Sequence, residues 1–86
     1  MERPELTFTP EVADLVRKHY EAADVILEYG SGGSTVMASE MPGKTIFSVE
    51  SSKIWTRQMR RWFKEAEPPS MPMMQYINIG ETGKWG

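Results

Sequence analysis

The stretch from Val25 to Thr35 constrains the fold of this chain more than any other part of its sequence. It begins with the apolar run Val25-Ile26-Leu27 and passes through Glu28-Tyr29 into the turn Gly30-Ser31-Gly32-Gly33, where a helix begins. Glycine adopts backbone conformations closed to other residues and carries no side chain, so such a turn brings bare main chain against a ligand. The stretch therefore predicts a strand, a ligand-binding turn and a helix in succession.

A second apolar run, residues 45–49, ends in the carboxylate of Glu50, which stands 20 residues after Gly30. This spacing is typical of a βαβ unit in which an acid at the tip of the second strand accepts hydrogen bonds from both hydroxyls of a ribose. We therefore expect the turn and Glu50 to lie together around a cofactor that contains a nucleoside.

Composition narrows the class of protein. The chain has 86 residues, 40% of them hydrophobic, with a net charge of -2 and a pI near 5.4. These values suit one small domain and argue against a general binder of nucleic acids or anionic membranes, which both need excess positive charge. With no cysteine and one histidine, we expect no disulfide and no metal site. The charged start and the lack of a long apolar run indicate neither a signal peptide nor a membrane span, and we expect a cytoplasmic protein.

The other elements follow from local signals. Thr9-Pro10-Glu11 is typical of a helix start and predicts a helix over residues 10–22 with a single apolar stripe. We expect strands over 24–29, 44–49 and 73–79, a helix over roughly 33–41, and another from a cap at Ser51 or Ser52 to the prolines at 68–69. The uninterrupted apolar run of the first strand predicts burial on both faces, as in a parallel sheet.

This order of elements predicts an α/β fold. With right-handed crossovers it gives the N-terminal half of a Rossmann-like three-layer sandwich (αβαβαβ) with parallel strand order 3-2-1. We divide the chain, 1–86, into an N-terminal helical segment (1–23), the cofactor-binding half (24–80) and a loop-like tail (81–86). Because the first strand would lie at an open edge, we expect the domain to be incomplete, a fragment or a chain that self-associates through that edge.

Details of the turn discriminate between cofactors. The dinucleotide pattern G-x-G-x-x-G, started at Gly30, places Thr35 at the third glycine, and the carboxylate of Glu28 would repel a pyrophosphate. No Gly-Lys-Ser/Thr triplet occurs, so the P-loop pattern also fails. A cationic ligand fits the turn better.

The segment Leu27-Glu28-Tyr29-Gly30-Ser31-Gly32-Gly33-Ser34 resembles motif I of class I S-adenosylmethionine-dependent methyltransferases, in which an acid precedes G-x-G by two positions. The resemblance implies S-adenosylmethionine as cofactor, with Glu28 serving the methionine amino group and Glu50 the ribose hydroxyls. It implies further that Ser51 lies beside the adenine and that Asn78 points toward its ring. The expected cofactor-binding residues are Glu28, Tyr29, Gly30, Ser31, Gly32, Glu50, Ser51 and Asn78.

The chain departs from that family in two respects. Ser34 replaces the third glycine of the usual G-x-G-x-G, and nothing corresponds to the strands after the third, which carry catalytic and substrate-binding residues in the family. No catalytic residue is identifiable. The turn and the closing Gly83-Lys84-Trp85-Gly86 resemble bacterial methyltransferase-like proteins. We expect the 86-residue chain alone to be inactive.

Two alternatives stay open. The chain could be a non-catalytic remnant or interaction module with a Rossmann-like fold, or, with less support, a fragment of an NAD-dependent oxidoreductase. A basic stripe on the helix after Ser52 could bind an anion such as RNA, but such a stripe is more often the solvated side of an amphipathic helix, so we expect no nucleic-acid partner. Its members are Lys53, Arg57, Arg60, Arg61 and Lys64.

Overall fold

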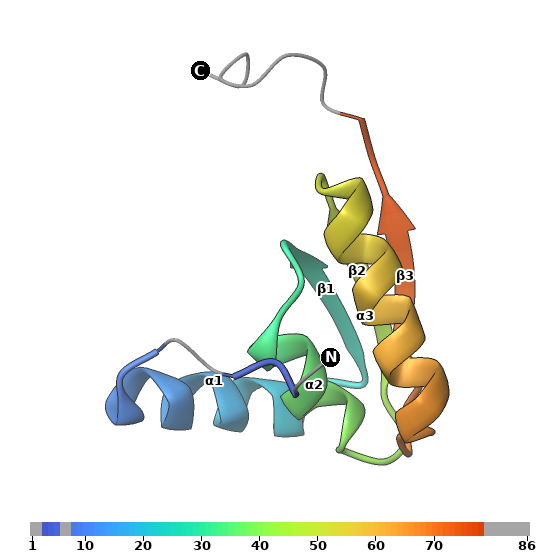
Figure 1. Ribbon diagram of the computed structural model, residues 1–86. Coiled ribbons are helices and arrows are strands. Elements are labelled where there is room, and N and C mark those ends of the chain that lie inside the picture. The colour runs from blue at the N-terminus through green and yellow to red at the C-terminus, as the bar shows by residue number, and fades with distance from the viewer. Residues whose placement is uncertain (1–2, 6–7, 79–86) are drawn as a thin grey trace.

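The computed structural model describes residues 3–5 and 8–78 and contains one sheet of three parallel strands with helices between them (Figure 1). In chain order the elements are α1 (Pro10–Ala22), β1 (Val25–Tyr29), α2 (Gly33–Ser39), β2 (Thr45–Glu50), α3 (Lys53–Ala66) and β3 (Met73–Tyr76). The strands lie in the order β1-β2-β3, and both neighbouring pairs are parallel. The predicted α/β class and the strand order are confirmed.

The helix starts follow the expected capping chemistry. The Thr9 hydroxyl accepts a hydrogen bond from the Val12 amide at 3.3 Å, and Pro10 occupies the first turn of α1, where its missing N–H costs nothing. Of the two serines that could cap α3, Ser52 does so, accepting from the Trp55 amide at 3.2 Å. The predicted α2 was two residues too long at its end, and β1 and β2 were each predicted to start one residue too early. Strand β2 ends one residue later than predicted. The prediction that β3 runs to residue 79 is wrong, because β3 ends at Tyr76 and the described residues 77–78 are not strand; residue 79 itself lies outside the described residues.

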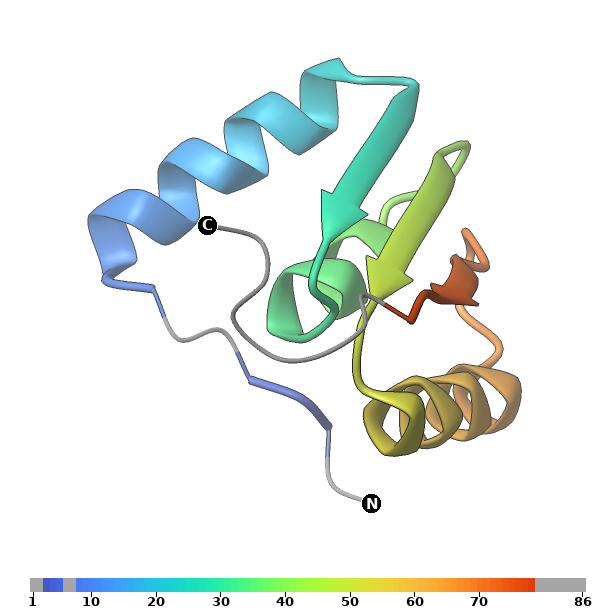
Figure 2. The same ribbon diagram turned by 90° about the horizontal axis from the view of Figure 1, so that it is seen from above.

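The core lies on one face of the sheet. Alternate residues of the strands point toward α2 and α3 and form two clusters with them. One consists of Val36, Met59, Phe63 and Met74, and the other of Ile26, Ala38 and Ile46. Figure 2 shows α2 and α3 on the same side of the strands. Right-handed crossovers between strands that are added in one direction place both helices there.

The opposite face of the sheet is open within the described residues. Val25, Leu27 and Tyr29 of β1 are 61%, 60% and 80% exposed, and Phe47 and Met73 share this face with exposures of 42% and 48%. The prediction that β1 is buried on both faces is therefore wrong for the described part of the chain. That part contains two layers of the expected three-layer sandwich, because no described helix crosses to this face.

Helix α1 contacts the core cluster through its C-terminal end. Tyr20 and Ala23 contact the cluster around Ile26, whereas Val12 and Leu15 are 43% and 56% exposed. In Figure 1 the N-terminal half of α1 extends beyond the edge of the sheet. The predicted apolar stripe of α1 is thus only partly buried. None of the helices that the structure describes is long and apolar enough to cross a membrane.

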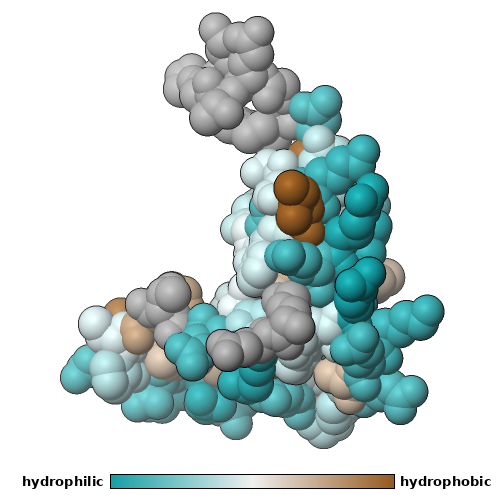
Figure 3. Space-filling view, in the orientation of Figure 1, coloured by the Kyte–Doolittle hydropathy of each residue, from teal (hydrophilic) through white to brown (hydrophobic). Residues whose placement is uncertain are grey.

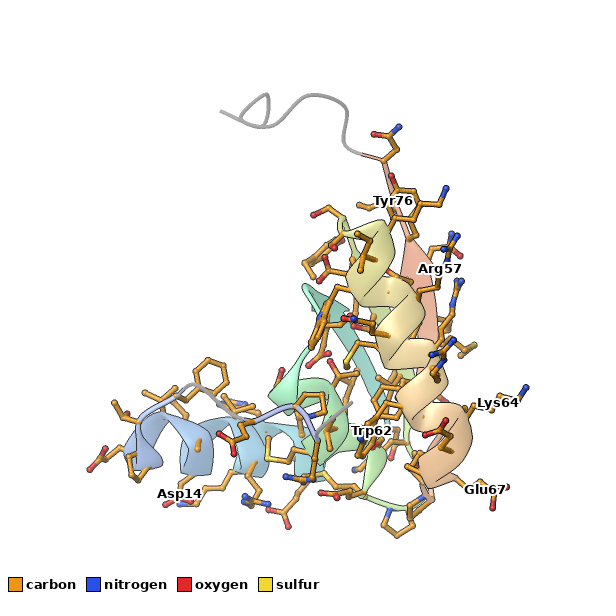
Figure 4. All side chains as sticks on the ribbon, viewed as in Figure 1. Asp14, Arg57, Trp62, Lys64, Glu67 and Tyr76 are labelled. Atoms are coloured by element: carbon orange, nitrogen blue, oxygen red, sulfur yellow. The ribbon has the colours of Figure 1, made fainter. Side chains whose placement is uncertain are left out.

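The basic stripe lies on the outer side of α3. Arg57 and Lys64 project away from the core (Figure 4), and the corresponding surface of the molecule is hydrophilic (Figure 3). Arg60 is exposed but donates a hydrogen bond to the Met74 carbonyl at 2.7 Å, which ties α3 to β3. One of the five cations therefore has a structural role, and the absence of a nucleic-acid partner stays a prediction.

We expect the isolated 86-residue chain to self-associate, because the open sheet face and the unpaired edge of β1 expose apolar side chains and backbone hydrogen-bonding groups. Sedimentation velocity across a tenfold or larger range of concentration measures this. The double variant Val25→Thr/Leu27→Thr keeps strand propensity while removing apolar surface, and it should shift the chain toward monomer. Ile54→Thr is the matched control, since Ile54 is 72% exposed on α3 and away from this face. A wild-type chain that stays monomeric throughout would contradict the expectation.

Candidate cofactor site at the carboxyl ends of the strands

The carboxyl ends of the three strands meet at one edge of the sheet. The Gly30 amide donates to the Val49 carbonyl at 2.7 Å, so the turn after β1 begins beside the end of β2. Glu50 pairs with Tyr76 in the register of β2 and β3, and the Ile77 amide donates to the Glu50 carbonyl at 3.0 Å. The structure thus brings together the glycine turn, the Glu50-Ser51 segment and the residues that follow β3.

Two of the expected site residues occupy less central positions. Tyr29 is 80% exposed, and its alternation with the inward-facing Glu28 places its side chain on the open face of the sheet. Only its backbone adjoins the turn. Asn78 comes two residues after the end of β3, at the same edge as Glu50, and is exposed.

The glycines of the turn leave open space beside the backbone. A Cβ atom added to Gly30 or Gly32 would have no neighbouring atom within 4 Å. Gly30 has a φ of 90°, which strongly favours glycine, whereas Gly32 has a φ of 173°, which any residue adopts. A cavity of about 160 Å³ lies at the turn, lined by Glu5, Phe8 and residues 30–34. Gly32 is therefore free of a backbone requirement for glycine, and the space beside it is available to a ligand.

The first three amides of the turn are already occupied. The Gly30 amide binds the Val49 carbonyl, the Ser31 amide donates to Glu50 Oε1 at 3.0 Å, and the Gly32 amide donates to Thr35 Oγ1 at 3.0 Å. The Ser31 carbonyl in turn accepts from Trp55 Nε1 at 2.7 Å. The turn is thus held rigidly by the protein itself and does not present these amides to an anion.

Glu50 joins the two loops of the site while keeping acceptor capacity. Its Oε1 accepts from the Ser31 amide at 3.0 Å and its Oε2 from the Ser52 amide at 2.7 Å. A carboxylate has about four lone-pair positions, so two remain for further donors. The side chain is half-buried, at the C-terminal end of β2.

Glu28, by contrast, is buried and fully hydrogen-bonded within the protein. It is only 6% exposed, and its carboxylate accepts from the hydroxyls of Tyr20 at 2.6 Å, Ser34 at 2.9 Å, Thr35 at 2.5 Å and Ser48 at 3.3 Å. Four donors fill the lone-pair positions of a carboxylate. These hydroxyl donors compensate for the hydration that the carboxylate loses when it is buried.

The hydroxyl donors around Glu28 are functional residues that the sequence interpretation missed. From sequence, Ser34 and Thr35 are only departures from glycine patterns, and Tyr20 falls in the helix that is expected to carry an apolar stripe. One signal was available: Ser48 follows Ile46 on the inward-facing side of β2, where a polar residue calls for a hydrogen-bond partner. Trp55 has two roles: it packs against the core cluster that contains Met59, and its Nε1 donates a hydrogen bond to the turn.

Burial and the hydrogen bond to the Glu28 carboxylate raise the pKa of Tyr20 well above its usual value near 10. Removing the proton would leave a phenolate beside a carboxylate in a poorly solvated place. Tyr20 therefore keeps its proton and serves as a donor that connects α1 to β1.

A search of solved structures found a similar protein, described as a methyltransferase-like protein from Silicibacter pomeroyi, whose crystal structure extends to 1.80 Å resolution. The two are 49% identical in sequence with a TM-score of 0.88, over 96% of this chain and 44% of that one. This chain has a methyltransferase-like fold. It spans less than half the length of that protein. No family model matches the chain, and no curated protein matches it.

We expect serine to be tolerated at Gly32 but not at Gly30. Gly30→Ser forces a side chain into a left-handed conformation and should lower the free energy of unfolding by about 1 to 3 kcal/mol. Gly32→Ser needs no unusual φ and supplies a good helix N-cap, so its free energy of unfolding should stay within about 0.5 kcal/mol of wild type. Urea unfolding of both variants measures the difference, and equal destabilisation would show that the turn differs from the geometry described above.

We expect Tyr20→Phe to lower the free energy of unfolding by about 1.5 kcal/mol at neutral pH, because it removes one hydrogen bond to a buried carboxylate. The pKa of Tyr20 is raised by folding, so its contribution is fully present below pH 10 and is lost as the pH rises through the folded-state pKa. The difference in melting temperature between wild type and variant should therefore shrink above about pH 10. Tyr29→Phe is the control, since Tyr29 is exposed. A difference that is constant up to pH 11 would argue against the Tyr20–Glu28 bond.

Proposed function

We propose that the chain forms the S-adenosylmethionine-binding part of a methyltransferase. The observation that carries the proposal is the position of Glu50: its carboxylate lies against the glycine turn, 3.0 Å from the Ser31 amide, with two acceptor positions left for the hydroxyls of a ribose. The methyltransferase-like fold of a protein 49% identical to this chain supports it.

The chemistry around the turn favours a cationic cofactor over a dinucleotide. A pyrophosphate needs backbone amides or cationic side chains, and the amides of Gly30, Ser31 and Gly32 already have partners within the protein. The described residues that line the cavity at the turn include a carboxylate, Glu5, and neither lysine nor arginine. An NAD-dependent oxidoreductase is therefore the weaker candidate.

The roles we propose for the site residues follow from their placement. The bare backbone at Gly30 and Gly32 accommodates the part of the ligand between ribose and amino acid, and Glu50 holds the ribose. Ser51 and Asn78 flank the position of the base. S-adenosylmethionine supplies an electrophilic methyl group, and the residues named here bind and orient it toward an acceptor.

A non-catalytic module is the alternative from another class. Its support is that every buried polar side-chain atom in the described part of the chain has a hydrogen-bond partner, so the turn is satisfied without a ligand. Such a module would keep the fold and bind no cofactor. The two candidate functions therefore differ in whether the chain binds a cofactor, which can be measured.

We expect the chain to bind S-adenosylmethionine and S-adenosylhomocysteine more tightly than NAD in calorimetric titrations. Gly32→Ser should bind S-adenosylhomocysteine at least tenfold more weakly, because its side chain occupies ligand space, even though its stability is preserved. Tighter binding of NAD would favour the oxidoreductase, and no binding of any of the three would favour the non-catalytic module.

The proposed contact between Glu50 and the ribose can be tested separately from the hydrogen bonds by which Glu50 supports the turn. We expect S-adenosylhomocysteine to bind more than tenfold more tightly than its 2′-deoxy analogue to the wild type, since a hydrogen bond to a charged group contributes on the order of 1.5 to 3 kcal/mol. In Glu50→Ala the two ligands should bind equally. Such a cycle isolates the contact between Glu50 and the hydroxyl from any general loosening of the turn. A preference that persists in the variant would mean that another group binds the ribose.

A further inference from the structure

The resemblance of motif I to the methyltransferase family assigns the methionine amino group to Glu28, but this side chain has no acceptor position left. It is 6% exposed, and its two oxygens accept four hydroxyl hydrogen bonds that come from α1, α2 and β2. A ligand ammonium could bind Glu28 only by displacing one of these donors and by reaching a buried group. Another acceptor must therefore serve the cationic end of the ligand.

Glu5 lies beside the same turn. It is exposed and lines the cavity of about 160 Å³ together with Phe8 and residues 30–34. Among the residues that the structure describes, Glu5 has no hydrogen-bonding or ionic partner. Its carboxylate is thus available, at a cavity whose size suits an amino-acid group.

The segment that carries Glu5 is anchored to the domain. Arg3 forms an ion pair with Glu40, at the end of α2, with a distance of 2.7 Å, and Pro4 is buried. Arg3 is thus paired with Glu40 and not with Glu5. Arg3 and the α1 residue Arg17 both line a neighbouring hollow of about 300 Å³ together with Glu5, and both are cations that could compete with a ligand for its carboxylate.

Resting on the proposed function, we propose that Glu5, rather than Glu28, binds the ammonium of the ligand's amino-acid end and thereby sets the preference for a ligand with that end. Glu28 is then a positioning residue, which holds the turn in place through hydroxyl groups. Each carboxylate then has one role. The buried, fully hydrogen-bonded Glu28 holds the turn in place, and the exposed, unpaired Glu5 binds the ammonium.

The test compares two ligands that differ only at the amino-acid end, S-adenosylhomocysteine and 5′-methylthioadenosine, by calorimetry on wild type and Glu5→Gln. We expect Glu5→Gln to bind S-adenosylhomocysteine at least tenfold more weakly and methylthioadenosine with unchanged affinity. Glu11→Gln is the matched control, since Glu11 is an exposed acid in the first turn of α1 and does not line the cavity. It should leave both affinities unchanged. Arg17→Gln should leave them unchanged or strengthen the binding of S-adenosylhomocysteine.

Each other outcome has a defined meaning. Unchanged affinity of Glu5→Gln for S-adenosylhomocysteine overturns the assignment to Glu5 while leaving the proposed function intact. Glu28→Gln that melts as the wild type does but loses S-adenosylhomocysteine selectively would restore the family assignment and also overturn the inference. Equal affinity of the wild type for both ligands would show that no amino-acid subsite exists. Binding of neither ligand by the folded wild type removes the proposed function and this inference together.

Discussion

The buried carboxylate of Glu28 is the constraint on which the rest of the site depends. Moving an isolated carboxylate out of water costs several kcal/mol unless it is hydrogen-bonded, and here four hydroxyl groups supply those bonds. Those donors come from α1, from the start of α2 and from β2. One side chain on β1 thus aligns three other elements, and the helix start after the glycine turn is held in a single position.

The two acids of the site illustrate how surroundings decide the role of a side chain. Glu28 and Glu50 both lie close to the turn, and both would be described from sequence as ligand-binding carboxylates. Glu28 is saturated and buried, whereas Glu50 accepts two backbone amides and is half-buried with positions to spare. Structural support and ligand binding are therefore assigned to different acids, and the turn stays rigid whether or not a ligand occupies it.

The arrangement of the sheet has a further consequence. Both crossover helices cover one face, so Val25, Leu27 and Tyr29 are exposed on the other. Parallel sheets are almost always covered on both faces, so this is the surface through which we expect the chain to self-associate.

The sequence by itself determined the elements and their order. Thr9 and Ser52 cap their helices, Gly30 allows the positive φ of the turn, and the spacing to Glu50 places an acid at the tip of β2, all of which depend on neighbours close in the chain. The tertiary structure alone decided which acid is closed and which face of β1 is covered. Both depend on residues distant in sequence: Tyr20 and Ser48 reach Glu28 only after α1 and β2 have packed against β1, and the covered face depends on where the crossover helices lie. The local sequence does not reveal such contacts, because the residues around a glutamate in the chain can be the same whether its hydrogen-bond donors come from the protein or from a ligand.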